Sequence, residues 1–422
     1  MIFDLDNWQE IWHSLSRNRL RTLLTAFGVF WGIFMLMVLI ASGTGLENGI
    51  TAGFARMASN SVFVWAMRAG KPYRGLPAGR SIDMTNEDTV ALREEVPEAQ
   101  LVLPRNRLGG WMGGNNVTRG RRTGAFTVFG DYSEVWQVEP LEMERGRFLD
   151  PLDLDSRRKV AVIGPRVREV LFEPGEDPIG ESIRIRGVYF QVVGLFRSLD
   201  RSERGEQAAE SIYIPFTTFQ RAFNAGEEVG WYVLLAEPGV PASRVEEKAI
   251  AALKQRHRVA PDDTRAFGSF NLEEEYNKVQ NLFTGISLLV WIVGVGTLAA
   301  GVIGVSNIML IIVRERTREI GLRRAVGATP LRITGQILLE SVTLTSIAGY
   351  FGLLAGVGLI EIIRAALARL PADSNRMFAN PGVGFETALQ GLAILVVAGL
   401  LAGMLPARRA LTISPREALH NE

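Results

Sequence analysis

The chain has 422 residues, with 46 lysines and arginines against 45 aspartates and glutamates, and it contains no cysteine. The balanced charge argues against a nucleic-acid-binding surface, and the lack of cysteine excludes a disulfide framework, a thiolate metal site and a cysteine nucleophile. The three histidines, His13, His257 and His420, are too scattered to predict a haem or zinc site. A chain of this length has room for roughly two or three domains.

Residues 1–21, before the first apolar run, have the pattern of an amphipathic helix. Trp8 and Trp12 fall on its apolar face, and tryptophan on such a helix favours the headgroup region of a membrane. Arginines close to the first run mark this end as cytoplasmic. We expect a helix that lies along the membrane lipid of the inner leaflet; the alternative is a soluble helix that packs on a partner.

Four apolar runs are long enough to cross a bilayer, which takes about 20 helical residues. They span Thr22–Leu46, Leu282–Val313, Ile333–Ile360 and Val383–Leu405. The first run is too long for a signal peptide, and no clear cleavage site follows it. The sequence therefore predicts a membrane protein with four transmembrane α-helices.

Residues 47–276 form one insertion between the first two runs, and it is large enough to bury its own core. Because a single crossing precedes it, this insertion lies outside the cytoplasm. Strand-like segments are Ser61–Met67, Ala125–Phe129, Lys159–Ile163, Ser182–Ile185, Tyr189–Leu195, Ser211–Ile214 and Trp231–Ala236. Helical patterns are Asn86–Val96, Arg166–Phe172, Thr217–Phe223 and Ser243–Arg256. Their irregular alternation predicts an α+β domain.

Three segments of the insertion are candidate contact surfaces: Arg68–Arg80, Leu108–Arg122 and Arg197–Glu210. The first two are rich in glycine, and the third is dense in charge. A solvated loop is the favoured interpretation of each. Trp111, a lone aromatic residue among glycines, is the best single candidate for a partner contact.

The second apolar run is longer than a span requires, so residues 277–313 are predicted to extend beyond the bilayer as a helix. Small residues recur at four-residue spacing in the apolar runs: Ala300 and Gly304, Gly352 and Gly356, Gly399 and Gly403. This spacing permits close helix packing but does not identify a dimer interface.

A basic hook, Arg314–Arg332, separates the second and third runs and carries six arginines and two glutamates. Such a segment stays on the cytoplasmic side, because the lysine and arginine bias sets orientation. Its interior predicts a short amphipathic helix that stops at Gly327, with Pro330 beyond. It is either an ordinary positive-inside loop or a docking element for a cytoplasmic partner.

Two carboxylates fall inside later runs, and a charge there predicts a functional site by default. Glu340, near the cytoplasmic end of its run, is expected to organise the hook by pairing with Arg323 or Arg324. Glu386, near the external end of the last run, is expected at the membrane interface. The remaining predicted boundaries are a third span over 333–360, a short external loop over 361–382, a fourth span over 383–405 and a cytoplasmic tail over 406–422.

The hook sequence ERTREIGLRRAVGAT, Glu315–Thr329, resembles the cytoplasmic loop of the MacB/FtsX-like permeases, the membrane subunits of type VII, or mechanotransmission, ABC transporters. The opening segment, Val160–Phe196, Ile212–Pro215 and the C-terminal tail also resemble this family. The resemblance implies a periplasmic domain, a stalk formed by spans one and two, and a homodimer. It also implies that a coupling helix docks on an ABC ATPase. The residues implied are Glu315, Arg316, Arg318, Glu319, Ile320, Gly321, Arg323, Arg324, Ala325, Gly327 and Ala328.

The sequence contains no G-x-x-x-x-G-K-[ST] motif, because its only Gly-Lys pair, Gly70-Lys71, is followed by Pro72. No nucleophile–base constellation stands out either. We therefore expect a non-catalytic subunit of the inner membrane with both termini cytoplasmic. The ATP and Mg would bind to a separate ATPase rather than to a fused domain.

The resemblance implies macrolide-exporter-like efflux of a drug, peptide or other periplasmic substrate through an adaptor and an outer-membrane channel. One alternative is lipoprotein release, another is FtsX-like control of cell-wall hydrolases, and a third is a membrane receptor or scaffold without an ATPase.

Overall fold

The computed structural model describes residues 19–51, 60–109, 114–199, 203–369, 378–382 and 384–412. The chain divides into two compact units. The helical unit comprises residues 1–49, 281–372 and 376–422, and the α+β unit comprises residues 50–280 with 373–375. The predicted N-terminal amphipathic helix, Trp111 and the end of the cytoplasmic tail lie outside the described residues.

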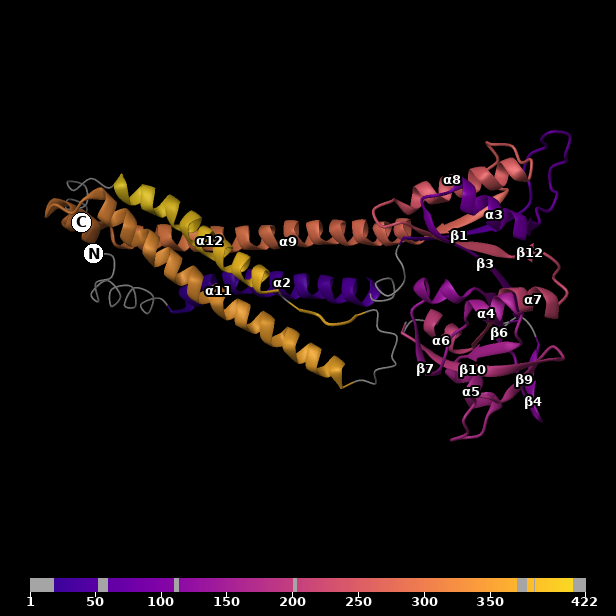
Figure 1. Ribbon diagram of the computed structural model, residues 1–422. Helices are drawn as coiled ribbons and strands as arrows, with labels where there is room; N and C mark the ends of the chain where they lie inside the picture. The colour runs from indigo at the N-terminus through magenta and orange to yellow at the C-terminus, as the bar shows by residue number, and fades with distance from the viewer. Residues whose placement is uncertain are drawn as a thin grey trace. The chain divides into compact units, whose positions relative to one another are not determined.

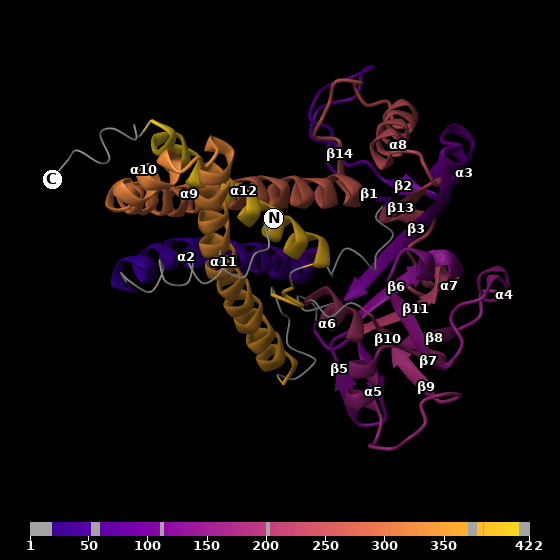
Figure 2. The same ribbon diagram turned by 90° about the vertical axis from the view of Figure 1, so that its left-hand side faces the viewer.

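Four long helices are apolar enough to cross a membrane by length and composition. They are α2 (Arg19–Thr51), α9 (Leu272–Glu315), α11 (Pro330–Ala368) and α12 (Phe385–Leu411), with the short α10 (Thr317–Ala325) between α9 and α11. Figures 1 and 2 both show α2 and α9 side by side, with α11 crossing them obliquely. The prediction of four membrane-length helices, with the α+β insertion after the first, is confirmed.

Glycines set the closest helix contacts of the helical unit. A Cβ built on Gly352 would lie 2.5 Å from the carbonyl oxygen of Phe30, so α11 touches the backbone of α2. Gly399 and Gly403 likewise face α11 side chains from α12. A Cβ on Gly304, in contrast, would meet no described atom within 4 Å. Two of the three predicted small-residue pairs therefore pack within the described part of the chain.

The α+β unit is built on a sheet with the strand order β14-β1-β13-β3-β6-β11-β8-β10-β9-β4-β5, and β7 pairs with β10. The strands are β1 (Ser61–Ala66), β3 (Ala99–Gly109), β4 (Val117–Arg119), β5 (Arg122–Gly124), β6 (Thr127–Asp131), β7 (Leu141–Gly146), β8 (Val160–Ile163), β9 (Ser182–Ile185), β10 (Val188–Ser198), β11 (Ser211–Pro215), β13 (Trp231–Ala236) and β14 (Phe267–Asn271). A separate pair joins β2 (Met84–Thr85) to β12 (Glu228–Val229). Only the β10–β8 and β11–β6 pairs of the described strands are parallel, so the unit is α+β.

Helices cover this sheet in two places. The helices of the unit are α3 (Asn86–Glu95), α4 (Pro151–Asp155), α5 (Pro165–Leu171), α6 (Glu203–Ala209), α7 (Phe216–Ala222), α8 (Ala242–Arg256) and the 3-10 helix η1 (Ser133–Gln137). One buried cluster joins α3 and α8 to β1 and β13, and another joins α5 and α7 to β8, β10 and β11. Because β3 pairs with β13 on one side and with β6 on the other, it links the two regions (Figure 1).

The loop predictions needed correction. Arg197–Glu210 was expected to be a solvated loop, but β10 extends to Ser198 and α6 occupies Glu203–Ala209, so that prediction is wrong for most of the segment. Leu108–Arg122 likewise contains the end of β3 and all of β4. Charged residues hid β4 and the end of β10: Arg119 pairs with Glu176 and Glu181, and Arg197 pairs with Glu142.

Asp88 ties α3 to α8. Its carboxylate accepts hydrogen bonds from Arg256 Nε at 2.9 Å and from the backbone N–H of Thr85 at 2.8 Å, and it lies 2.9 Å from His257 Nε2. Burial alone raises the pKa of this carboxyl, but the contacts with His257 and Arg256 outweigh burial and lower the pKa to about 2. Asp88 therefore stabilises the unit at neutral pH, and this contribution is lost only as the pH falls from about 4 towards 2.

Candidate functional site

The hook begins where α9 ends at Glu315. Arg316 leaves helical geometry for one residue (φ −97°, ψ 14°), and α10 starts at Thr317. The Thr317 hydroxyl donates to the carbonyl oxygens of Val313 at 3.2 Å and Arg314 at 2.8 Å. These bonds satisfy carbonyls that the end of a helix leaves without intrahelical partners. The junction between α9 and α10 is therefore a defined bend.

Gly327 makes the second bend of the hook. It has φ +99°, a conformation that only glycine adopts easily. Its N–H donates to Arg324 O at 3.1 Å, and the N–H of Ala328 donates to Arg323 O at 2.9 Å. This pair of bonds is the Schellman motif that closes a helix. The predicted stop at Gly327 is thus present, and α11 begins at Pro330.

α10 presents two different faces. Ile320 is buried in the same apolar cluster as Val313 of α9 and Ile333 of α11. Three apolar side chains of the hook are instead exposed: Leu322 by 55%, Val326 by 83% and Leu331 by 84%. We call Leu322, Val326 and Leu331 the apolar tip. Three exposed apolar side chains within ten residues, interleaved with arginines in the sequence, favour an interaction surface over a solvated loop.

Ion pairs and hydrogen bonds attach the hook to the helices behind it. Arg323 pairs with Glu319 at 2.7 Å and donates to Gln336 of α11 at 3.0 Å. Arg324 Nη1 donates to the carbonyl oxygen of Leu411, the last residue of α12, at 3.1 Å. Because these contacts reach α11 and α12, a displacement of α10 would also act on those two helices.

Glu340 lies in α11 behind the hook and is 3% exposed. Arg316 forms an ion pair with it at 3.5 Å, and the sequence analysis did not name this partner. Arg316 is the residue of the bend, so this pair joins the α9–α10 junction to α11. A cavity of about 30 Å³ beside the pair is lined by Arg316, Arg323, Gln336 and Glu340 with apolar neighbours, and it is large enough for a water molecule.

The predicted coupling residues therefore have different positions in the hook. Exposed residues are Glu315, Arg318, Glu319, Ala325 and Gly327; partly buried residues are Arg316, Arg323, Arg324 and Ala328; buried residues are Ile320 and Gly321. The prediction did not include the three residues of the apolar tip. The signal that could have identified them was the placement of Leu322, Val326 and Leu331 among arginines.

Glu386 does not belong to this site. It lies exposed in the first turn of α12, where the helix dipole favours a negative charge. Arg408 and Arg409 lie in the last turn of the same helix, roughly 33 Å away at 1.5 Å per residue. Glu386 therefore lies at the opposite end of α12 from Leu411, which contacts the hook.

Within the described residues, no group of three or more His, Asp and Glu side chains is placed to hold a metal ion. A short amphipathic helix with a cationic rim and an apolar tip can bind a protein surface and move with it. Its attachments to α9, α11 and α12 allow that movement to reach the long helices.

Comparison with known families gives two matches along the chain. Residues 22–252 match the MacB-like periplasmic core domain, and residues 291–415 match the FtsX-like permease C-terminal region. The second match contains the hook and all the contacts described above. Together the two matches extend over most of the sequence.

Individual relatives agree with these matches. The chain is 31% identical to the pyoverdine export ATP-binding/permease protein PvdT of Pseudomonas putida, over 99% of this chain and 60% of that protein. It is 28% identical to the macrolide export ATP-binding/permease protein MacB of Vibrio parahaemolyticus, over 96% of this chain and 58% of that protein. The chain thus spans less than two thirds of the length of these relatives. The crystal structure of the periplasmic region of MacB from Actinobacillus actinomycetemcomitans is similar to 55% of this chain and 98% of its own chain, with 18% identity and a TM-score of 0.43.

Proposed function

This chain belongs to the MacB/FtsX-like permease family of ABC transporters, and from that premise we propose that it couples an ABC ATPase to movement of its periplasmic domain. ATP and Mg bind to the ATPase, and its closure displaces the hook. The hook passes the displacement to α9, a continuous helix of 44 residues that starts directly after β14 of the α+β unit. This movement drives the export of a periplasmic drug, peptide or other substrate.

The observation that carries this proposal is the apolar tip on an anchored hook. A loop whose only task is to keep positive charge inside needs no exposed Leu322, Val326 and Leu331. Nor does it need Arg316, Arg323 and Arg324 bonded to Glu340, Gln336 and Leu411. A segment that binds a partner and transmits its motion needs both an exposed apolar surface and bonds to the helices behind it.

The assembly that we propose follows from the same family membership. Two copies of this chain pair with two ATPase subunits, and a periplasmic adaptor connects the α+β units to an outer-membrane channel. Both termini lie in the cytoplasm, on the side of the hook.

Replacing Val326 with aspartate tests the coupling directly. Burial of a valine on docking contributes about 1.5–3 kcal/mol, so its loss weakens the complex at least tenfold. We expect the variant to insert normally but to capture little ABC ATPase on co-purification, and to lose stimulation of ATP hydrolysis.

Val90→Asp is the matched control, because Val90 is 56% exposed on α3 of the other unit. That variant should capture the ATPase normally. Normal capture by the Val326 variant would contradict the role of the tip, and ATP hydrolysis by the purified chain alone would contradict the proposed function.

Cysteine labelling tests the orientation, since the natural chain has no cysteine. A single cysteine at Arg74, in the α+β unit, should react with a membrane-impermeant maleimide added to spheroplasts. A single cysteine at Leu322 should react only after the membrane is broken. The opposite pattern would invert the proposed topology.

A further inference from the structure

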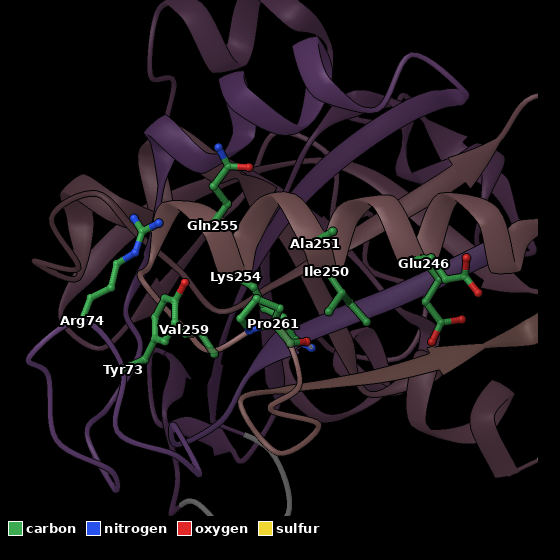
Figure 3. Close-up of a pocket in the computed structure, with 10 residues that line it drawn as sticks. Tyr73, Arg74, Glu246, Ile250, Ala251, Lys254, Gln255, Val259 and Pro261 are labelled. Carbon is green, nitrogen blue, oxygen red and sulfur yellow. Dashed lines mark hydrogen bonds between the residues drawn. The ribbon is translucent and has the colours of Figure 1, made fainter.

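A groove of about 600 Å³ lies in the α+β unit between α8 and the segment Arg68–Arg80, which we call the arm. Its volume is within the range of small-molecule sites, about 300–1,000 Å³. Tyr73 and Arg74 come from the arm, and Ile250 and Ala251 come from the middle of α8. Figure 3 shows Arg74 and Glu246 at opposite ends of the row of labelled side chains.

The arm is held in place, although its sequence predicted a solvated loop. The buried carboxylate of Asp263 accepts hydrogen bonds from the backbone N–H groups of Gly70 at 2.6 Å and Lys71 at 3.1 Å. The Lys71 ammonium pairs with Asp262 at 2.5 Å, and Arg265 Nη2 donates to the carbonyl oxygen of Gly70 at 3.1 Å. These contacts fix the base of the arm to the segment after α8, so the groove has a fixed wall.

A tight turn places Arg74 at the rim. Tyr73 and Leu76 exchange backbone hydrogen bonds of 3.1 and 2.9 Å around Arg74 and Gly75. Both central residues have positive φ, 48° for Arg74 and 82° for Gly75, as a type I′ turn requires. Asparagine or glycine is the usual residue at the first of these positions, and arginine there is conformationally costly. Arg157, Arg186 and Arg258 also have positive φ, so the turn fixes the position of Arg74 but does not by itself assign it a function.

The charged groups at the two ends of the groove have hydrogen-bond donors and acceptors that a ligand could use. Within the described residues, the side chains of Arg74 and Glu247 form no hydrogen bond or ion pair, and the Arg74 guanidinium lies 5.4 Å from the centre of the Tyr73 ring. Lys254 gives one of its three N–H donors to the carbonyl oxygen of Pro261 at 3.0 Å. Glu246 accepts from Asn271 at 2.9 Å through one carboxylate oxygen. One end is therefore cationic and the other anionic.

The spacing of these charges sets the size of the ligand. Glu247 and Lys254 are seven residues apart on α8, which corresponds to about 10 Å along the helix axis. An extended peptide advances about 3.3–3.6 Å per residue, so the charged ends of a tripeptide are about 10 Å apart. The apolar surface between them, from Ile250, Ala251 and Val259, can bind side chains.

We propose that this groove binds a short extended peptide of three or four residues with free termini. Its carboxylate lies against Arg74 and Lys254, and its ammonium group lies against Glu246 and Glu247. Both contacts are charge-assisted, and the apolar floor supplies affinity without strict side-chain selection. The binding depends on the α+β unit alone and not on the proposed coupling to an ATPase.

Titration calorimetry of the full-length protein in detergent tests this with the tripeptide Leu-Ala-Leu. The free tripeptide should bind, and either N-acetylation or C-amidation should weaken binding about tenfold, because each cap removes one charge-assisted contact. In Arg74→Gln the amidation penalty should fall, because only Lys254 remains to bind the carboxylate, while the acetylation penalty should stay unchanged. In Glu247→Gln the pattern should reverse.

Arg166→Gln is the control, since Arg166 is an exposed arginine of α5 that pairs with Glu169 away from the groove. It should bind all three peptides as the natural protein does. The proposal is overturned if the free tripeptide fails to bind at millimolar concentration, or if capped and free peptides bind equally, as they would to a site for an internal segment of a larger protein. It is also overturned if both penalties stay unchanged in both variants.

Discussion

Replacing Arg105 with methionine is expected to lower the free energy of unfolding of the α+β unit by about 3–5 kcal/mol. The side chain of Arg105 is 3% exposed and lies 2.6 Å from the carboxylate of Asp131, which is fully buried. A second ion pair joins Arg105 to Glu139, and Glu139 accepts a hydrogen bond from the Tyr213 hydroxyl. Methionine would leave Asp131 buried without its countercharge.

The position of this network explains why its loss should destabilise the whole unit. Arg105 belongs to β3, the strand that pairs with β13 on one side and β6 on the other, and Asp131 ends β6. The guanidinium also lies over the rings of Phe129 at 4.8 Å and Trp231 at 5.4 Å. Burial lowers the pKa of Arg105, but the charges of Asp131 and Glu139 outweigh burial and raise it above the ordinary value, so the guanidinium stays charged.

Thermal and denaturant unfolding of the purified chain measures this effect. Arg145→Met is the matched control, because Arg145 pairs with Asp177 at 2.7 Å but both side chains are about half exposed. Exposed pairs contribute at most about 1 kcal/mol, so the control should unfold nearly as the natural protein does. Equal stability of the two variants would show that the buried network does not stabilise the unit.

Replacing Gly352 with valine should destabilise the helical unit by about 3 kcal/mol or more, because overpacking against a backbone atom cannot be relieved by rotating a side chain. A Cβ at this position would lie 2.5 Å from Phe30 O, closer than a van der Waals contact permits. α11 would have to move away from α2, and the Gly356 contact with Met37 one turn later would be lost as well. Detergent-solubilised protein should unfold at a lower temperature than the natural protein.

Gly358→Val separates packing from helix propensity. Gly358 lies on the same helix, but a Cβ built there meets no described atom within 4 Å. Both variants replace a helical glycine with a β-branched residue, so the propensity term is shared and the difference reports the α2–α11 contact. If the two variants unfold at the same temperature, that contact does not limit the stability of the unit.

Elements that a local sequence pattern defines could be predicted, whereas β3 could not. A membrane span is defined by a continuous apolar run, and Leu282–Val313 therefore indicated α9 without any knowledge of its neighbours. Seven strands could also be anticipated from local sequence, because they are rich in β-branched and aromatic residues. β3 could not, since its Pro104, Arg105 and Asn106 interrupt the apolar pattern.

The helix of the hook and its stop were also predictable from local sequence. The basic composition of Arg314–Arg332 and the glycine at position 327 indicated a cytoplasmic helix with a defined stop, and the Schellman bonds at Gly327 are present. The ion pair between Arg316 and Glu340 was not predictable, because it depends on how the junction between α9 and α10 lies against α11.

For this protein, the sequence by itself determined the four spans, their order around one α+β insertion and the placement of a basic hook between two of them. These properties depend on hydrophobic runs and charge bias within short windows. Only the tertiary structure decided that Arg105 is a buried network residue, that Gly352 touches the backbone of α2 and that Arg74 faces α8 across a groove. Each of these depends on pairing between segments far apart in the chain, which no local pattern records.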